Sequence, residues 1–145
     1  MNPTDSPIDW VARHIKEYVE TDGRKGHRRW GVTTLLLTTL GRRSGRPRRT
    51  ALIYGTDGDR LVVVGSNGGA DAHPAWYLNL MADPVAEVQV GAEKFAVTAA
   101  KASGEDRERL WAMMAALWPD YDRYRKQTVR AIPVVVLDPL PRQSR

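Results

Sequence analysis

Hydrophobic and polar positions divide the chain into a helical beginning, a strand-rich middle, and a helix and strand near the end. The first apolar positions recur at helical spacing, and they are Ile8, Val11, Ile15, Tyr18 and Val19. Ser6 stands where an N-cap would, followed by Pro7 in the first turn. We therefore expect an amphipathic helix that begins after Ser6 and is followed by a polar, basic loop over residues 21–29.

Six later segments have the apolar runs or the alternation that is typical of strands, and they are 32–40, 50–54, 60–64, 85–90, 94–101 and 132–137. The first is rich in leucine and threonine, which indicates a strand buried on both faces. The Asp57-Gly58 pair predicts a hairpin that joins 50–54 to 60–64. A turn over 91–93 joins the next two strands, and Pro133 marks the start or the edge position of the last one.

Two further helices are predicted between these strands. One begins at Pro74 and ends near Met81, and a longer one follows Ser103 as its N-cap. The apolar face of the longer helix consists of Leu110, Trp111, Met114, Leu117 and Trp118. Strands in hairpins with helices at the start, middle and end predict an α+β fold. We expect a small antiparallel β-barrel of five or six strands, with residues 1–31 as helix and basic loop, in one domain spanning 1–145.

Composition narrows the class of protein. The chain has 145 residues, 42% of them hydrophobic, which suits a single domain with a real core. It has no cysteine and three scattered histidines, so no disulfide and no metal site is expected. No apolar run reaches the roughly 18 residues that span a bilayer, and the N-terminus is polar. These features predict a cytoplasmic protein.

Charge is concentrated in one short segment. Five arginines lie between Arg42 and Arg49, and without them the net charge of +5 would be zero. Gly41, Gly45 and Pro47 make residues 41–50 a tight turn, which we call the arginine turn, and arginine matches phosphate and carboxylate geometry. A compact anionic ligand explains this better than nucleic acid, although a solvated basic loop or an anionic membrane surface would also suit the charge.

Three other segments are candidates for ligand binding. Ser66-Asn67-Gly68-Gly69 allows close backbone approach to an anion, or is a flexible turn. Trp76 and Asn79 lie on the helix that follows Pro74, where the first packs and the second is placed to hydrogen-bond a ligand. Aromatic residues recur at Trp118, Tyr121 and Tyr124, either to line a pocket or to pack. No catalytic triad or carboxylate pair is present, so any chemistry would come from a bound cofactor.

The order of these motifs along the chain is distinctive. They read LTTLGRRSGRPR, then DGDRLVVVGSNGG, then HPAWYLNLMADP. The set resembles the deazaflavin-dependent nitroreductase family, which uses coenzyme F420 on a split β-barrel related to flavin-binding oxidoreductases. The resemblance extends from about Thr33 to Pro139, and it implies a split, antiparallel β-barrel of five to seven strands over 32–139. The chain departs from the family's usual residues at Ala51, Asn67 and Trp118.

The resemblance implies an F420H2-dependent reductase, in which hydride passes from C5 of the reduced deazaflavin to a quinone, an enone or lactone, or a nitroaromatic. It implies a cofactor site, whose residues would be Arg42, Arg43, Arg48, Ala51, Ser66, Asn67, Gly68, Trp76 and Asn79. It also implies a substrate site at Trp118, Tyr121 and Tyr124, with the tyrosines positioning the acceptor or donating a proton.

Two alternatives to this function remain. The first is an FMN-binding oxidoreductase on the same barrel, in which the arginine turn would bind one phosphate. The second is a non-catalytic basic domain that binds nucleic acid, which we rank last because the tryptophans lie mostly in predicted helices. The expected partners are therefore a small-molecule electron acceptor and no nucleic acid. Peripheral contact with the inner membrane face, and a monomer or a homodimer, both fit the sequence.

Overall fold

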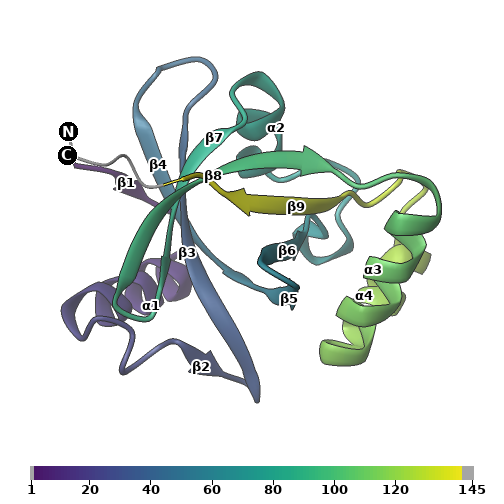
Figure 1. Cartoon of the computed structure of the whole chain (residues 1–145), viewed down its shortest axis with the longest axis horizontal. Coiled ribbons are helices and arrows are strands. Elements are labelled where there is room, and N and C mark those ends of the chain that lie inside the picture. The colour runs from purple at the N-terminus through teal and green to yellow at the C-terminus, as the bar shows by residue number, and fades with distance from the viewer. Residues whose placement is uncertain (1, 142–145) are drawn as a thin grey trace.

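The computed structural model describes residues 2–141, in which nine strands form a strongly curved sheet (Figure 1). The strands are β1 Thr4–Asp5, β2 Arg28–Arg29, β3 Val32–Leu40, β4 Pro47–Ile53, β5 Gly55–Asp57, β6 Arg60–Val64, β7 Val85–Val90, β8 Glu93–Lys101 and β9 Val134–Pro139. Their order across the sheet is β1-β4-β3-β7-β8-β9-β6-β5, and β2 pairs with β3. Among the strands of residues 2–141, only β1 and β4 are paired in parallel; the other pairs are antiparallel.

The expected α+β fold is confirmed, with two differences in its strands. The six strands of five or more residues match the six predicted segments, while β1, β2 and β5 are two or three residues long and carry too little pattern to be predicted. The hairpin at Asp57-Gly58 joins β5 to β6, not residues 50–54 to β6. Strand β4 pairs along its whole length with β3, because the arginine turn returns the chain directly beside the strand it has just left.

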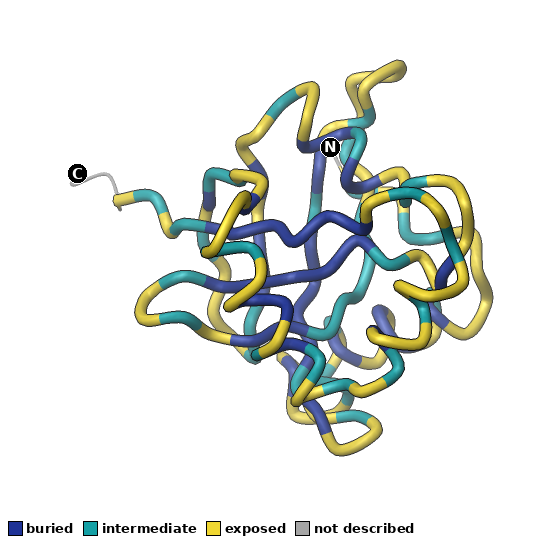
Figure 2. The backbone as a smooth tube through the Cα atoms, turned by 90° about the vertical axis from the view of Figure 1, so that its right-hand side faces the viewer, coloured by how far each residue is buried: buried dark blue, intermediate teal, exposed yellow. Residues whose placement is uncertain are grey.

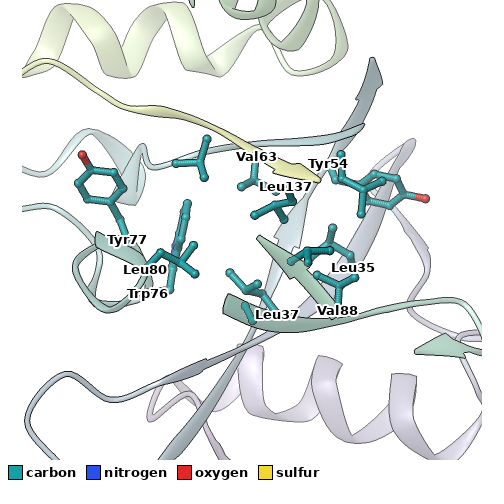
Figure 3. Packing of buried hydrophobic residues seen from close by; sticks show 13 residues of the cluster. Leu35, Leu37, Tyr54, Val63, Trp76, Tyr77, Leu80, Val88 and Leu137 are labelled. Atoms are coloured by element: carbon teal, nitrogen blue, oxygen red, sulfur yellow. The ribbon is translucent and has the colours of Figure 1, made fainter. Parts of the chain in front are cut away.

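Neighbouring residues of the long strands are buried on opposite faces, as the apolar run of β3 predicts. Leu35 and Leu37 point into one cluster with Val63, Leu80 and other side chains (Figure 3), while Leu36 packs against the first helix. Val62 and Val64 of β6 pack on the opposite face from Val63. The strands therefore run through the buried centre of the molecule, and most exposed positions lie on helices and loops (Figure 2).

Four α-helices and one short 3-10 turn complete the described residues, and they are α1 Asp9–Glu20, η1 Asn67–Gly69, α2 Ala75–Ala82, α3 Gly104–Leu117 and α4 Asp120–Gln127. Helix α4 was not predicted. Helix α1 begins after Ile8, so the prediction of Ser6 as N-cap is wrong: β1 keeps this end of the chain extended beside β4. Ile8 is accordingly exposed, as is Leu117 at the end of α3. No helix in residues 2–141 is long and apolar enough to span a membrane.

Candidate active site

A large cleft of about 1010 Å³ runs along β3 and β4, and every site residue that the sequence predicts lies in its lining. The predicted residues in its lining are Arg42, Arg43, Arg48, Ala51, Ser66, Asn67, Gly68, Trp76, Asn79, Trp118, Tyr121 and Tyr124. The arginine turn follows the end of β3, and Trp30 precedes the start of this strand. Nine extended residues span about 30 Å, so these two groups line opposite ends of the cleft.

The end of the cleft at the arginine turn is cationic. Arg42, Arg43 and Arg48 line it, and none of them forms an ion pair within residues 2–141. Arg49 also lines the cleft, but its Nε lies 2.7 Å from Oδ1 of Asp5, which neutralises it. Arg46 is exposed and lies outside the lining. The turn therefore presents three uncompensated guanidinium groups to the cleft.

Asn79 is hydrogen-bonded to one arginine of this cationic end, Arg42. Its side chain is buried, and its Oδ1 accepts hydrogen bonds from the backbone N–H and from Nη1 of Arg42, both at 3.1 Å. Its Nδ2 donates to Oγ1 of Thr39 at 3.1 Å. The sequence predicts Asn79 as a ligand-binding residue; in the structure its amide orients Arg42.

The loop from Ser66 to Gly69 forms one wall of the cleft. Asn67, Gly68 and Gly69 all have left-handed backbone conformations, with φ of 48°, 64° and 83°. A right-handed residue at Ser66 followed by left-handed residues directs consecutive N–H groups to one side, which is the geometry of an anion-binding nest. Asparagine tolerates this conformation better than most residues, which suits it to position 67.

Gly69 fixes the distance between this loop and α4. A Cβ added there would collide with Oε1 of Gln127 and lie 3.2 Å from Cα of Tyr124. We expect Gly69→Ala to destabilise the protein by about 2 kcal/mol, from the left-handed backbone and the displaced helix together. Thermal unfolding measures this. Gly58→Ala is the matched control, because Gly58 has a φ of 62° and open space around its Cβ position, so it should lose only the backbone part. Equal losses in the two variants would contradict the close packing of Gly69.

The opposite end of the cleft is aromatic. Trp118 lies between α3 and α4, and its ring centroid is 6.2 Å from that of Trp30, which is 5.7 Å from that of Trp10. His14 of α1 also contacts Trp30, with ring centroids 6.1 Å apart. Trp30 has a φ of 54°, an uncommon conformation for a bulky residue. Trp10, Trp30 and His14 were missed by the sequence analysis, because nothing local brings the start of α1 and the end of α3 together.

Tyr121 is a buried tyrosine in the lining of the cleft beside this aromatic end. The residue is 5% exposed, and within residues 2–141 nothing hydrogen-bonds its hydroxyl group. Burial, and secondly the neighbouring Tyr124, raise the pKa of Tyr121 above its usual value. The phenol therefore keeps its proton at neutral pH and remains free to donate it in a hydrogen bond. Tyr124 is less buried, and its ring lies 6.3 Å from that of Tyr121.

Arg130 is a further residue that sequence reasoning missed. It lies outside every predicted motif, and its guanidinium group reaches the loop of residues 65–70, which lies 60 to 65 positions earlier in the chain. No local pattern signals such a contact. Its hydrogen bonds hold the wall of the cleft that contains the nest.

Known structures define the class of protein to which this fold and cleft belong. A solved structure described as a putative pyridoxamine 5'-phosphate oxidase from Listeria innocua has a TM-score of 0.53 at 15% identity and covers 74% of this chain and 84% of its own, so it shows the fold alone. The chain thus has the split-barrel fold of this structure.

More similar structures narrow this class. An F420H2-dependent reductase shares 35% identity and a TM-score of 0.68, covering 72% of this chain and 93% of that one. A structure described as a domain-swapped dimer shares 34% identity and a TM-score of 0.71, covering 92% of this chain and 100% of that one.

Sequence comparison gives the family. Residues 10–139 match the family model described as F420H(2)-dependent quinone reductase. An F420H2-dependent quinone reductase of Mycobacterium tuberculosis is 40% identical over 141 residues, covering 88% of this chain and 95% of the relative. The chain belongs to the F420H2-dependent quinone reductase family. The expected enzyme class, an oxidoreductase, and the expected cofactor, coenzyme F420, are thereby confirmed.

Proposed function

We propose that the protein reduces a quinone, with F420 bound along the cleft and the quinone held at its aromatic end. The observation that carries this proposal is the separation of charge from aromatic surface within one continuous cleft. A cofactor with an anionic tail and a planar ring, followed by a planar acceptor, has this same order of chemical character. Each end of the cleft then has a ligand of matching chemistry.

The cationic end suits F420 better than FMN. F420 carries a phosphate and a glutamate tail, whereas FMN has a single phosphate. Arg42, Arg43 and Arg48 present three guanidinium groups without acidic partners in the described residues, which is more than one phosphate requires. We assign these three arginines to the phosphate and the tail. Asn79 contributes by holding Arg42 in place.

The middle of the cleft suits a planar ring. Ala51 of β4 offers a small side chain there, and Trp76 of α2 an aromatic one. The backbone of Ser66, Asn67 and Gly68 approaches from the wall of the cleft. We assign these residues to the deazaflavin ring and its adjoining phosphate. When bound in its reduced form, F420 supplies the hydride, from C5 of its ring.

The aromatic end suits a planar acceptor with a carbonyl oxygen. Conversion of a quinone to a quinol takes up one hydride and one proton, and negative charge develops on a carbonyl oxygen as hydride arrives. Tyr121 offers a protonated phenol beside that end of the cleft, with Tyr124 next to it. We assign both tyrosines to positioning the acceptor and hydrogen-bonding its oxygen, and Trp118 to packing on its ring. Trp30 and Trp10 extend this aromatic surface.

Peripheral contact with a membrane stays a prediction. Trp10 and Trp30 are 49% and 50% exposed at the aromatic end, and Arg24, Lys25, Arg28 and Arg29 lie in the loop and strand before Trp30. Exposed aromatic and basic side chains together suit an anionic lipid surface, where lipophilic quinones are found. A homodimer also stays a prediction for this chain, alongside a monomer.

Anaerobic turnover tests the proposed function. The purified protein is mixed with F420H2 and a short-chain quinone, and oxidation of F420H2 is followed by its absorbance. We expect quinone-dependent oxidation of one F420H2 per quinol formed, and little oxidation with a nitroaromatic at the same concentration. Oxidation of F420H2 that does not depend on quinone, or that prefers the nitroaromatic, would contradict quinone as the acceptor.

A further inference from the structure

The guanidinium group of Arg130 is bound by four acceptors that all belong to residues 65–73. Its Nη2 donates to the carbonyl oxygen of Ser66 at 2.7 Å, and its Nε to that of Ala70 at 2.8 Å. Its Nη1 donates to the carbonyl oxygen of Gly65 at 3.2 Å and lies 3.1 Å from Nδ1 of His73. These contacts bracket the left-handed segment Asn67–Gly69 on both sides. Arg130 therefore fixes where the loop begins and where it ends.

We propose that Arg130 is the positioning residue of the cofactor-binding loop, and that it holds the loop in its binding geometry only while His73 is neutral. The inference rests on the proposed function, because it takes residues 66–68 as cofactor contacts. It adds two residues to that site and a dependence of cofactor affinity on pH. Neither residue needs to touch the cofactor for this effect, since both act through the backbone of the loop.

The protonation state of His73 follows from the hydrogen bond itself. A guanidinium group has donors and no acceptor, so Nδ1 of His73 must be the acceptor and its proton must lie on Nε2. Protonation at Nδ1 would place an N–H against the N–H of Arg130 and bring two cations 3.1 Å apart. The hydrogen bond would be lost, and the repulsion would push Arg130 away from the loop.

The surroundings of His73 favour its neutral form. Burial lowers the pKa of His73 below its usual value, and the positive charges of Arg130 and Lys101 lower it further. The ring of Tyr77 lies 4.8 Å away. The nearest carboxylate along the chain, Asp71, accepts a hydrogen bond from Oγ1 of Thr128 at 2.9 Å. At neutral pH the ring is therefore neutral and available to Arg130.

The sign of the pH effect follows from this lowered pKa. A base whose pKa is lower in the folded, binding-competent state favours that state at high pH and opposes it once protonated. Cofactor affinity should therefore be full at neutral and alkaline pH. It should fall as the pH drops below about 6.5, the ordinary pKa of histidine, and through the lower pKa of His73 in the folded protein.

Cofactor binding, followed by F420 fluorescence between about pH 5 and about pH 8, tests the proposal. In Arg130→Lys the charge remains but most of the four hydrogen bonds are lost, so we expect affinity to fall at least about tenfold at neutral pH. In His73→Asn the amide oxygen can replace Nδ1 as an acceptor that does not titrate. We expect the affinity of this variant to be the same at low pH as at neutral pH. Arg109→Lys is the control, because Arg109 bonds Asp57 and Asp106 outside the cleft.

The outcomes separate this inference from the proposed function. If the wild type does not bind F420, the proposed function fails. If the wild type binds and Arg130→Lys binds equally well, or if His73→Asn loses affinity at low pH as steeply as the wild type, the positioning role is wrong. Should Arg130→Lys fail to fold, the pH profile of His73→Asn still tests the positioning role. Any titration of the cofactor itself affects the wild type and His73→Asn equally, so a difference between their profiles comes from His73.

Discussion

Replacing Arg48 by alanine is expected to weaken F420 binding by about 1.5–3 kcal/mol, the usual range for a hydrogen bond to a charged group. Arg48 lines the cationic end of the cleft and has no ion-pair partner in the described residues, so its charge is available to the cofactor. Arg49 is a poorer choice, because Asp5 already neutralises it. Isothermal calorimetry with the oxidised cofactor measures the loss directly.

The turn itself supplies the control. Arg46→Ala removes the same charge from the same turn, but Arg46 is exposed and outside the cleft, so cofactor affinity should change little at moderate salt. The loss in Arg48→Ala should shrink with a cofactor that lacks the glutamate tail, if Arg48 holds that tail. Equal affinities for Arg48→Ala and the wild type would mean that the turn is a solvated basic loop.

Tyr121→Phe is expected to lower kcat/KM for a quinone by about tenfold to a few hundredfold, by analogy with loss of an oxyanion-hole donor. The side chain is 5% exposed and its hydroxyl has no protein partner in residues 2–141, so removal of that hydroxyl costs little packing. F420 affinity should stay the same, because the hydroxyl of Tyr121 is assigned to the acceptor, while the phosphate and tail of F420 are assigned to the arginines. Steady-state kinetics and a fluorescence titration separate the two effects.

Phenylalanine variants of two other tyrosines serve as comparisons for Tyr121→Phe. Tyr124→Phe should have a smaller effect, since its ring is less buried and stacks beneath Arg123, whose Cζ lies 5.4 Å from the ring centroid. Tyr54 is buried outside the cleft, so Tyr54→Phe should leave kcat/KM unchanged. If Tyr121→Phe keeps full turnover but melts several degrees lower, Tyr121 is a packing residue and hydride transfer relies on positioning alone.

The pattern of hydrophobic and polar residues was enough to predict the strands whose burial is visible in their own sequence. Strands β3 and β7 have the predicted bounds. The apolar run of β3 indicates burial on both faces, and the alternation in β7 indicates burial of alternate residues. Helix α4 was not visible. Its sequence DYDRYRKQ is almost entirely polar, and the single buried side chain, Tyr121, leaves no apolar period to detect.

The remaining differences come from contacts between distant segments. The chain before α1 looks like a helix start, but pairing of Thr4 and Asp5 with Arg48 and Arg49 of β4 holds it extended. Similarly, the partner of β4 is decided by β3, with which it shares the arginine turn, and not by the hairpin signal that follows. Pairing of this kind depends on tertiary structure, which a local pattern does not encode.

The residues of the candidate site were likewise predicted only in part. Its cationic turn, its glycine loop and its tyrosines were predicted from residue type and motif order, and one cleft contains them all. Trp30 and Arg130 were not predicted, because each acts on residues far from it in the chain. Asn79 was predicted at the site, but only the structure gives it Arg42 and Thr39 as partners.

The most direct test of F420 as the cofactor of this cleft is a side-by-side titration of the purified protein with F420 and with FMN, followed by fluorescence. Three uncompensated arginines at one end of the cleft predict that F420 binds far more tightly than FMN, and that raised salt narrows the difference. A deazaflavin without phosphate and tail should lose most of this advantage. Binding of FMN as tight as that of F420, or tighter, would contradict the account and favour an FMN enzyme on the same barrel.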